Sequence, residues 1–224
     1  MTNYNFTIII PFKKGISFLK QCINAVLNQT YKYVDLVVLV DCDSNADGAI
    51  DYLKNLPVKN LRIVNSEIPL NIYQNWDRIK DLELSEFSTI LGYDDILEPF
   101  FLDTINNLIN QFPDNNVYHT HFNYIDAKNG FLKNCFTLPE TLDFVAYTNL
   151  FLQNKISIMA TGYVFNSKAY KNIGGININY ANLIYADVEL WLELIGDKKL
   201  IVSPLNAFKF RTHQNTTQIS NSDV

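Results

Sequence analysis

Short apolar runs alternate with amphipathic segments over the N-terminal half, and this alternation constrains the fold more than any other feature of the chain. The first run, Phe6–Pro11, is dominated by β-branched residues, as expected of a strand buried on both faces. Similar strands are expected at residues 36–40, 61–64 and 87–91, with helices at 16–27, 49–56 and 72–82 between them. Because strands that alternate with helices form βαβ units, the sequence predicts an α/β fold with a mainly parallel mixed sheet flanked by helices.

The second half is less regular. It is expected to contain helices at 100–112 and 186–194, strands at 117–125 and 158–165, and a loop-rich segment at 126–142. Asp143 is placed to cap a further helix that runs through residue 152. The chain has no internal repeat, low-complexity tract or Gly/Ser-rich linker, so we expect one domain over residues 1–224, on its own or as part of a longer protein.

Composition narrows the functional classes. The net charge of -5 and a pI near 5.1 argue against a nucleic-acid-binding face. The three cysteines show no C-x-x-C spacing, which favours a reduced, cytoplasmic setting. No apolar run approaches the ~18 residues of a membrane helix, so membrane contact, at the inner face of the cell membrane, would be peripheral.

Carboxylates gather where the predicted strands end. Asp94 and Asp95 directly follow the strand at 87–91, while Asp41 and Asp43 follow the strand at 36–40. Asp187 opens a late helix. Ligands of open α/β sheets bind beyond the carboxyl ends of the strands, and paired acids there could hold a hard cation on a diphosphate. The ordinary alternative is that these acids occupy turns or cap helices.

Several segments, in their order along the chain, resemble the family 2 glycosyltransferases, which have the GT-A fold and use nucleotide-diphospho-sugars. The resemblance covers nearly the whole length and rests on Thr7–Pro11, Leu19–Tyr31, Val40–Gly48, Asn71 with Asn75-Trp76, Leu91–Leu97, Gly174-Gly175, Ala186–Leu192 and Arg211–His213. It implies a Rossmann-like GT-A fold with a nucleotide-binding half at about residues 1–98 and an acceptor-binding half at about 99–224.

The resemblance also implies roles for the nucleotide site. Pro11 and Phe12 would lie beside the base, and Asp41 would accept hydrogen bonds from the base or ribose, with Asp43 as a second candidate. Asp94 would face the ribose or the metal.

The remaining roles concern the metal, the phosphates and the chemistry. Asp95 would be the principal ligand of Mg²⁺ or Mn²⁺, and His213 would contact the metal or the diphosphate. Arg211 is a phosphate candidate. Asp187 matches the family's catalytic base, which deprotonates the acceptor hydroxyl.

The chain departs from the family pattern in three places. The segment after the second strand is one residue longer than usual, Tyr93 stands where an acid is frequent, and Ala186 replaces the usual Glu before the catalytic Asp. These departures leave in place the acids at 41, 95 and 187.

The leading hypothesis is an inverting glycosyltransferase that moves a sugar, by default from a UDP-sugar, to a glycan or lipid-linked acceptor. Bacterial surface polysaccharide, capsule or lipopolysaccharide synthesis is the expected setting. Ala186 supports an alternative, a noncatalytic nucleotide-sugar or glycan-binding assembly partner. A sugar nucleotidyltransferase is a third hypothesis, which the lack of a Gly-rich N-terminal loop disfavours.

Overall fold

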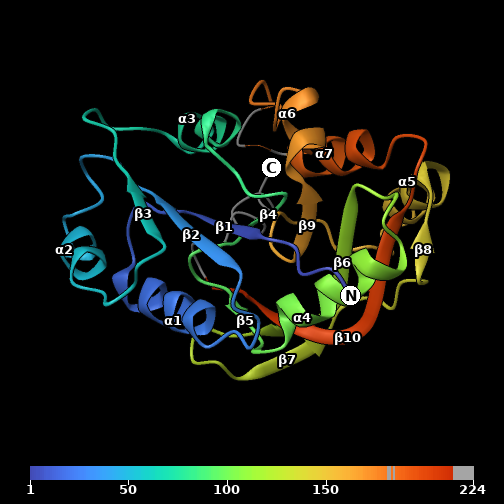
Figure 1. Ribbon diagram of the computed structural model, residues 1–224, viewed down its shortest axis with the longest axis horizontal. Helices are drawn as coiled ribbons and strands as arrows, with labels where there is room; N and C mark the ends of the chain where they lie inside the picture. Colours follow the sequence, from blue (N-terminus) through green and yellow to red (C-terminus); the bar gives the residue numbers. More distant parts are fainter. Residues whose placement is uncertain (181–182, 184, 214–224) are drawn as a thin grey trace.

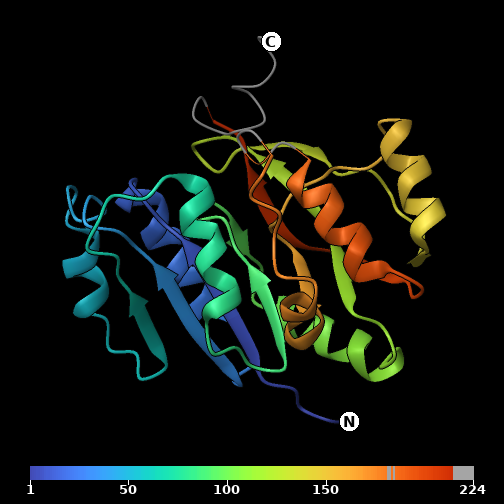
Figure 2. The ribbon, with the colours of Figure 1, turned by 90° about the horizontal axis from the view of Figure 1, so that it is seen from above.

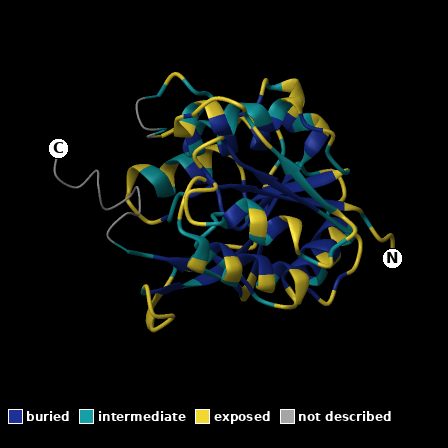
Figure 3. Ribbon diagram, turned by 90° about the vertical axis from the view of Figure 1, so that its left-hand side faces the viewer, coloured by how far each residue is buried: buried dark blue, intermediate teal, exposed yellow. Residues whose placement is uncertain are grey.

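A ten-stranded mixed sheet forms the centre of the molecule in the computed structural model, which describes residues 1–180, 183 and 185–213. The strand order is β3-β2-β1-β4-β9-β6-β10-β5, with β7 paired to β6 and β8 paired to β10. Helices α3, α6 and α7 cover one face of this sheet, and α1 and α4 cover the other (Figures 1 and 2). The central strands of the sheet are the most deeply buried part of the chain (Figure 3). The GT-A-like α/β architecture is therefore confirmed.

The N-terminal half follows the predicted alternation. Its strands are β1 (Phe6–Pro11), β2 (Val34–Leu39), β3 (Leu61–Val64) and β4 (Phe87–Ile90), and neighbouring strands among them pair in parallel. The intervening helices are α1 (Ile16–Leu27), α2 (Ala49–Lys54) and α3 (Ile72–Asp77). The helix expected at 72–82 is shorter than predicted, because α3 changes into a 3₁₀ turn, η1 (Arg78–Asp81).

The C-terminal half completes the sheet. Its strands are β5 (Ile96–Leu97), β6 (Val117–Ile125), β7 (Phe131–Asn134), β8 (Thr141–Leu142), β9 (Tyr163–Asn166) and β10 (Leu200–Arg211). Strand β9 runs antiparallel to both β4 and β6, whereas β10 runs parallel to β6. The helices are α4 (Phe101–Gln111), α5 (Phe144–Leu152), α6 (Ser167–Asn172) and α7 (Ala186–Ile195).

Three expectations for this half need correction. The strand predicted at 158–165 is confined to β9, and the residues before it form a loop. The loop-rich segment at 126–142 contains β7 and β8. The long strand β10 and the short helix α6 were not predicted. The predicted cap is confirmed, because the Asp143 carboxylate accepts a hydrogen bond from the Ala146 N–H at 2.8 Å.

Side chains that follow α1 fix the segment between β5 and α4. Gln29 donates to the carbonyl oxygen of Glu98 at 2.7 Å and accepts from the Leu102 N–H at 3.1 Å. The Thr30 hydroxyl donates to the Pro99 carbonyl at 2.8 Å. This bracing anchors the chain just after the Asp94-Asp95 loop.

Of the helices in the described part of the chain, none is both long and apolar enough to cross a membrane.

Candidate functional site

A cavity of about 340 Å³ lies beyond the carboxyl ends of β1 and β4. Five of the predicted site residues line it, and they come from three separate parts of the chain: Pro11, Phe12, Asp94, Asp95 and Asp187. The position is the one at which open α/β sheets bind ligands. The fold thus brings Pro11 and Phe12, the Asp94-Asp95 pair and Asp187 to one cavity.

Phe12 forms a fixed part of the cavity wall. Its side chain is buried and meets the Tyr93 ring edge to face, with ring centroids 5.5 Å apart. Tyr93, the residue that stands in place of a frequent acid, therefore packs against the predicted base site. The departure from the family pattern supplies an aromatic wall.

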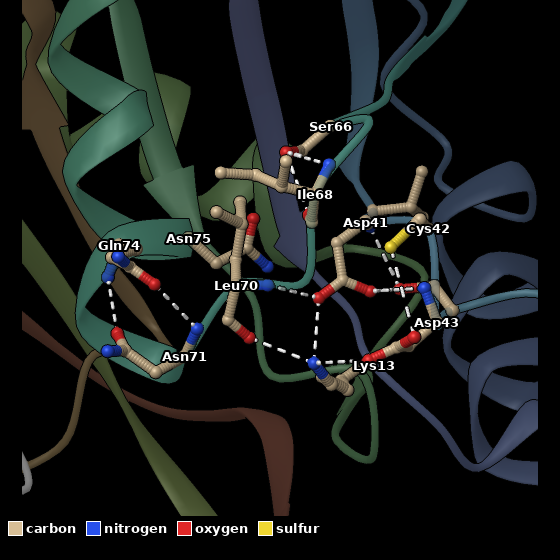
Figure 4. Close-up of polar contacts among 12 residues, drawn as sticks. Lys13, Asp41, Cys42, Asp43, Ser66, Ile68, Leu70, Asn71, Gln74 and Asn75 are labelled. Carbon is tan, nitrogen blue, oxygen red and sulfur yellow. Dashed lines mark hydrogen bonds and ion pairs between the residues drawn. The ribbon is translucent and has the colours of Figure 1, made fainter.

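Asp41 is held by four donors, of which those from Lys13, Leu70 and Asp43 can be followed in Figure 4. Its Oδ2 accepts from the Lys13 ammonium at 2.8 Å and from the Leu70 N–H at 2.8 Å. Its Oδ1 accepts from the Ser44 hydroxyl at 2.8 Å and from the Asp43 N–H at 3.1 Å. Burial opposes ionisation, but the hydrogen bonds from Lys13, Leu70 and Ser44 outweigh it and lower the pKa of Asp41 to about 2. Asp41 is therefore an ionised carboxylate whose acceptor sites are used within the protein.

Asp43 and Asp47 have other surroundings. Asp43 is exposed, and its Oδ2 lies 3.5 Å from the Lys13 ammonium. Asp47 accepts hydrogen bonds from the N–H groups of Gly15 and Ile16, both at 2.9 Å, and so caps the N-terminus of α1. The acidic run after β2 thus serves in part to fix the loop between β1 and α1.

Asp94 and His213 form a pair beside the cavity. The Oδ2 atom of Asp94 lies 2.7 Å from Nε2 of His213, and the His213 ring stacks on Phe18 with centroids 5.1 Å apart. Asp94 lines the cavity, and the imidazole of His213 is held against its carboxylate.

Asp95 is more deeply buried than Asp94. Its Oδ2 accepts from the Thr161 hydroxyl at 2.6 Å, and its Oδ1 accepts from the Arg211 N–H at 2.8 Å. Burial, with a smaller effect from the charge of Asp94, raises the pKa of Asp95 well above its ordinary value. Thr161 also accepts from the Gly92 N–H at 2.9 Å, so this network ties the loop after β4 to the loop before β9. Both carboxylate oxygens of Asp95 thus accept hydrogen bonds from within the protein.

Arg211 is buried, and four protein oxygens accept hydrogen bonds from its side chain. Nε donates to the Asp94 carbonyl, Nη1 to the Asp126 carbonyl and the Asn129 side chain, and Nη2 to the Gln21 side chain, at 2.7 to 3.3 Å. Its guanidinium carbon also lies 4.7 Å from the centre of the Phe18 ring. These contacts support a role in positioning the Asp94 loop and give no support to a phosphate contact.

Asp187 lies in the first turn of α7 and faces the cavity. Its side chain is half-buried, and burial raises the pKa of Asp187 to about 7. Among the described residues, no side chain or backbone group donates a hydrogen bond to its carboxylate. A carboxylate with a pKa near neutrality and open to a cavity is suited to accept a proton.

Sequence reasoning missed two residues of the site, Lys13 and Thr161. Lys13 directly follows the predicted Pro11-Phe12 pair, and this position just after β1 could have identified it as a site residue. Nothing in the sequence marks Thr161, because its contact with Asp95 depends on the antiparallel pairing of β9.

The described side chains alone do not form a complete metal site, so a metal here would depend on ligand and water oxygens. Within residues 1–180, 183 and 185–213, no group of three or more His, Cys, Asp and Glu side chains could hold a metal ion. Mg²⁺ bound with a nucleotide commonly takes only one or two protein ligands, and phosphate oxygens and water complete its shell. The Asp94 carboxylate and the His213 imidazole, 2.7 Å apart, are hydrogen-bonded to each other, so a metal held by both would replace this hydrogen bond.

Two solved structures of one protein share the fold. The crystal structure of S. aureus TarS 1–349 in complex with UDP-GlcNAc superposes with a TM-score of 0.71 at 15% identity, over 98% of this chain and 62% of that one. The complex of TarS 1–349 with UDP gives a TM-score of 0.67 at 15% identity, over 93% and 60%.

A curated relative points the same way. Glycosyltransferase GlyG of Streptococcus pneumoniae serotype 4 is 20% identical over 164 residues, which is 73% of this chain and 53% of GlyG. The chain thus spans about half the length of that relative. Residues 7–173, which include the cavity segments up to Thr161, match the family described as glycosyl transferase family 2. The chain therefore belongs to glycosyltransferase family 2.

Proposed function

We propose that the cavity binds a nucleotide-diphospho-sugar and that the chain transfers the sugar to a hydroxyl acceptor with inversion. The observation that carries this proposal is the convergence of Pro11, Phe12, Asp94 and Asp187 on one cavity. A UDP-sugar is the reference donor, because TarS, which shares the fold, was crystallised with UDP-GlcNAc and with UDP.

Asp94 and His213 are the proposed ligands of Mg²⁺ or Mn²⁺, and this assignment replaces the initial preference for Asp95. The metal, when bound, would neutralise charge on the diphosphate leaving group. Asp95 would act indirectly, since its hydrogen bonds to Thr161 and to the Arg211 N–H hold the loop that carries Asp94.

Asp187 is the proposed general base. The acceptor oxygen attacks the anomeric carbon, its proton passes to the Asp187 carboxylate, and the bond from that carbon to the diphosphate oxygen breaks. The nucleoside diphosphate leaves with the bonding electron pair. A single displacement of this kind inverts the anomeric configuration. Positioned bases contribute roughly a hundred- to ten-thousand-fold in rate.

The acceptor is proposed to be a glycan or lipid-linked hydroxyl in the synthesis of a bacterial surface polysaccharide, capsule or lipopolysaccharide. A cytoplasmic protein at the periphery of the inner membrane face would meet such an acceptor. These proposals follow from the family resemblance.

Release of nucleoside diphosphate from a panel of UDP-, GDP- and CDP-sugars, with and without Mn²⁺, tests the function. We expect slow hydrolysis of at least one donor, which Asp187→Asn reduces at least a hundredfold while the donor still binds. Donor binding without turnover in the wild type would instead favour the noncatalytic assembly partner. A wild-type rate in Asp187→Asn would contradict the assignment of the base.

A further inference from the structure

The carboxylate expected to contact the nucleotide base is shielded from the cavity. Asp41 is not among the described residues that line the cavity, and its side chain is only 2% exposed. An ionised carboxylate has about four acceptor positions, and four protein donors occupy those of Asp41. A base N–H could reach this carboxylate only by displacing one of them.

Lys13 stands in front of Asp41. Its side chain is 47% exposed and lines the cavity, as does Leu70, whose carbonyl oxygen accepts from the Lys13 ammonium at 2.9 Å. An ammonium has three donors and no acceptor. Lys13 donates to Asp41 at 2.8 Å and to the Leu70 carbonyl at 2.9 Å. Its third contact, with exposed Asp43, is longer at 3.5 Å, so a ligand would replace this contact most easily. Figure 4 shows Lys13 between Asp41, Asp43 and Leu70.

The cavity therefore presents a hydrogen-bond donor where the resemblance implies an acceptor. This exchange matters at N3 of a pyrimidine, where uracil carries an N–H donor and cytosine carries an acceptor. A carboxylate accepts from uracil N3 and repels the lone pair of cytosine N3. An ammonium can donate to the O2 carbonyl oxygen of either base, and also to N3 of cytosine.

We propose that Lys13, and not Asp41, reads the base, so that the site does not discriminate against CDP. This inference rests on the proposed function, since it concerns the base of the proposed donor. Lys13 acts as a specificity residue: it neutralises Asp41 and offers the cavity a donor that both pyrimidines can use. Without Lys13, the cavity exposes an Asp41 oxygen that favours uracil at N3, where cytosine has no donor.

Calorimetric titration with UDP and CDP at one fixed Mn²⁺ concentration tests the proposal. For the wild type, CDP should bind no more than fivefold more weakly than UDP. In Lys13→Met, the preference for UDP over CDP should rise more than fivefold, because hydrogen-bonding sites reject ligands that leave their groups unpaired. Lys13→Arg, which keeps the donors, should stay within fivefold of the wild-type ratio. Lys14→Met is the matched control at the neighbouring exposed lysine.

The possible outcomes distinguish a failure of the Lys13 inference from a failure of the proposed function. A wild-type preference for UDP above fivefold, or a change below fivefold in Lys13→Met, would overturn the role of Lys13. Absence of binding by every nucleotide to the wild type would instead reject the proposed function. Lys13→Ala provides the same comparison if the Met variant does not fold, as judged from its melting transition.

Discussion

Replacing Asp187 with Asn should remove the proposed base and stabilise the fold at the same time. The pKa of an unperturbed Asp is about 3.9, whereas the pKa of Asp187 is about 7 in the folded protein. A gap of about three units, at 1.36 kcal/mol per unit, sets a ceiling of about 4 kcal/mol on the destabilisation by the ionised group. Since Asp187 is half-buried and open to the cavity, solvent screens part of this energy, and we expect about 1–2 kcal/mol.

The sign follows from proton binding. Between pH 4 and pH 7 the folded carboxyl retains a proton that the unfolded chain has lost, so wild-type stability falls as the pH rises through this range. Asp187→Asn has no such group. Its melting temperature should therefore exceed that of the wild type by about 2–8 °C at pH 8 and by almost nothing at pH 4.

Differential scanning calorimetry across pH 4 to pH 8 measures this difference. Asp197→Asn, at an exposed acid just after α7, is the matched control and should show no pH-dependent gain. Equal melting temperatures for Asp187→Asn and wild type at pH 8, or a gain that is independent of pH, would refute the raised pKa of Asp187.

Three further variants test the framework of the site by thermal unfolding. Arg211→Lys should lower the free energy of unfolding by about 3 kcal/mol, because lysine cannot span the four oxygen acceptors of the buried guanidinium; a loss below 1 kcal/mol would contradict a structural role. Asp47→Ala should cost about 1 kcal/mol through loss of the cap on α1, and an unchanged melting temperature would exclude that cap. Gly162 and Gly48 both have positive φ (85° and 79°), but only a Cβ at position 162 would meet the Phe208 ring. Gly162→Ala should therefore be about 2–4 kcal/mol less stable than Gly48→Ala, and equal losses of stability would show that backbone strain alone matters.

The regular half of the fold could be predicted from the sequence because β1, β2 and β4 are largely buried and clear helical patterns separate the strands. The boundaries of β1, β3 and β6 match the prediction. Strand β10 was not predicted, because Pro204 interrupts its apolar pattern and a proline argues against a central strand. In the structure the register of β10 on β6 shifts just after Ser203, so a bulge accommodates the break.

The site was predictable to the extent that it depends on strand ends. Asp94 and Asp95 were expected at the rim, while Asp187 was assigned to the site only by the family resemblance, and all three line one cavity. Which of the paired acids faces a ligand could not be predicted, because it depends on the Thr161 hydroxyl and on the backbone of β10. Arg211 likewise looked like an anion-binding residue until its four hydrogen bonds to protein oxygens were located.

Thermal unfolding with UDP, in the presence and absence of Mn²⁺, tests the central claim that this cavity is a metal-assisted nucleotide-sugar site. At a hundred times its dissociation constant, UDP should add about 2.7 kcal/mol, which corresponds to about 5–11 °C. The shift should require Mn²⁺, disappear in Asp94→Ala and persist in Asp114→Ala, at an exposed acid after α4. No shift with UDP, CDP or GDP, or one that Asp94→Ala leaves intact, would contradict the account.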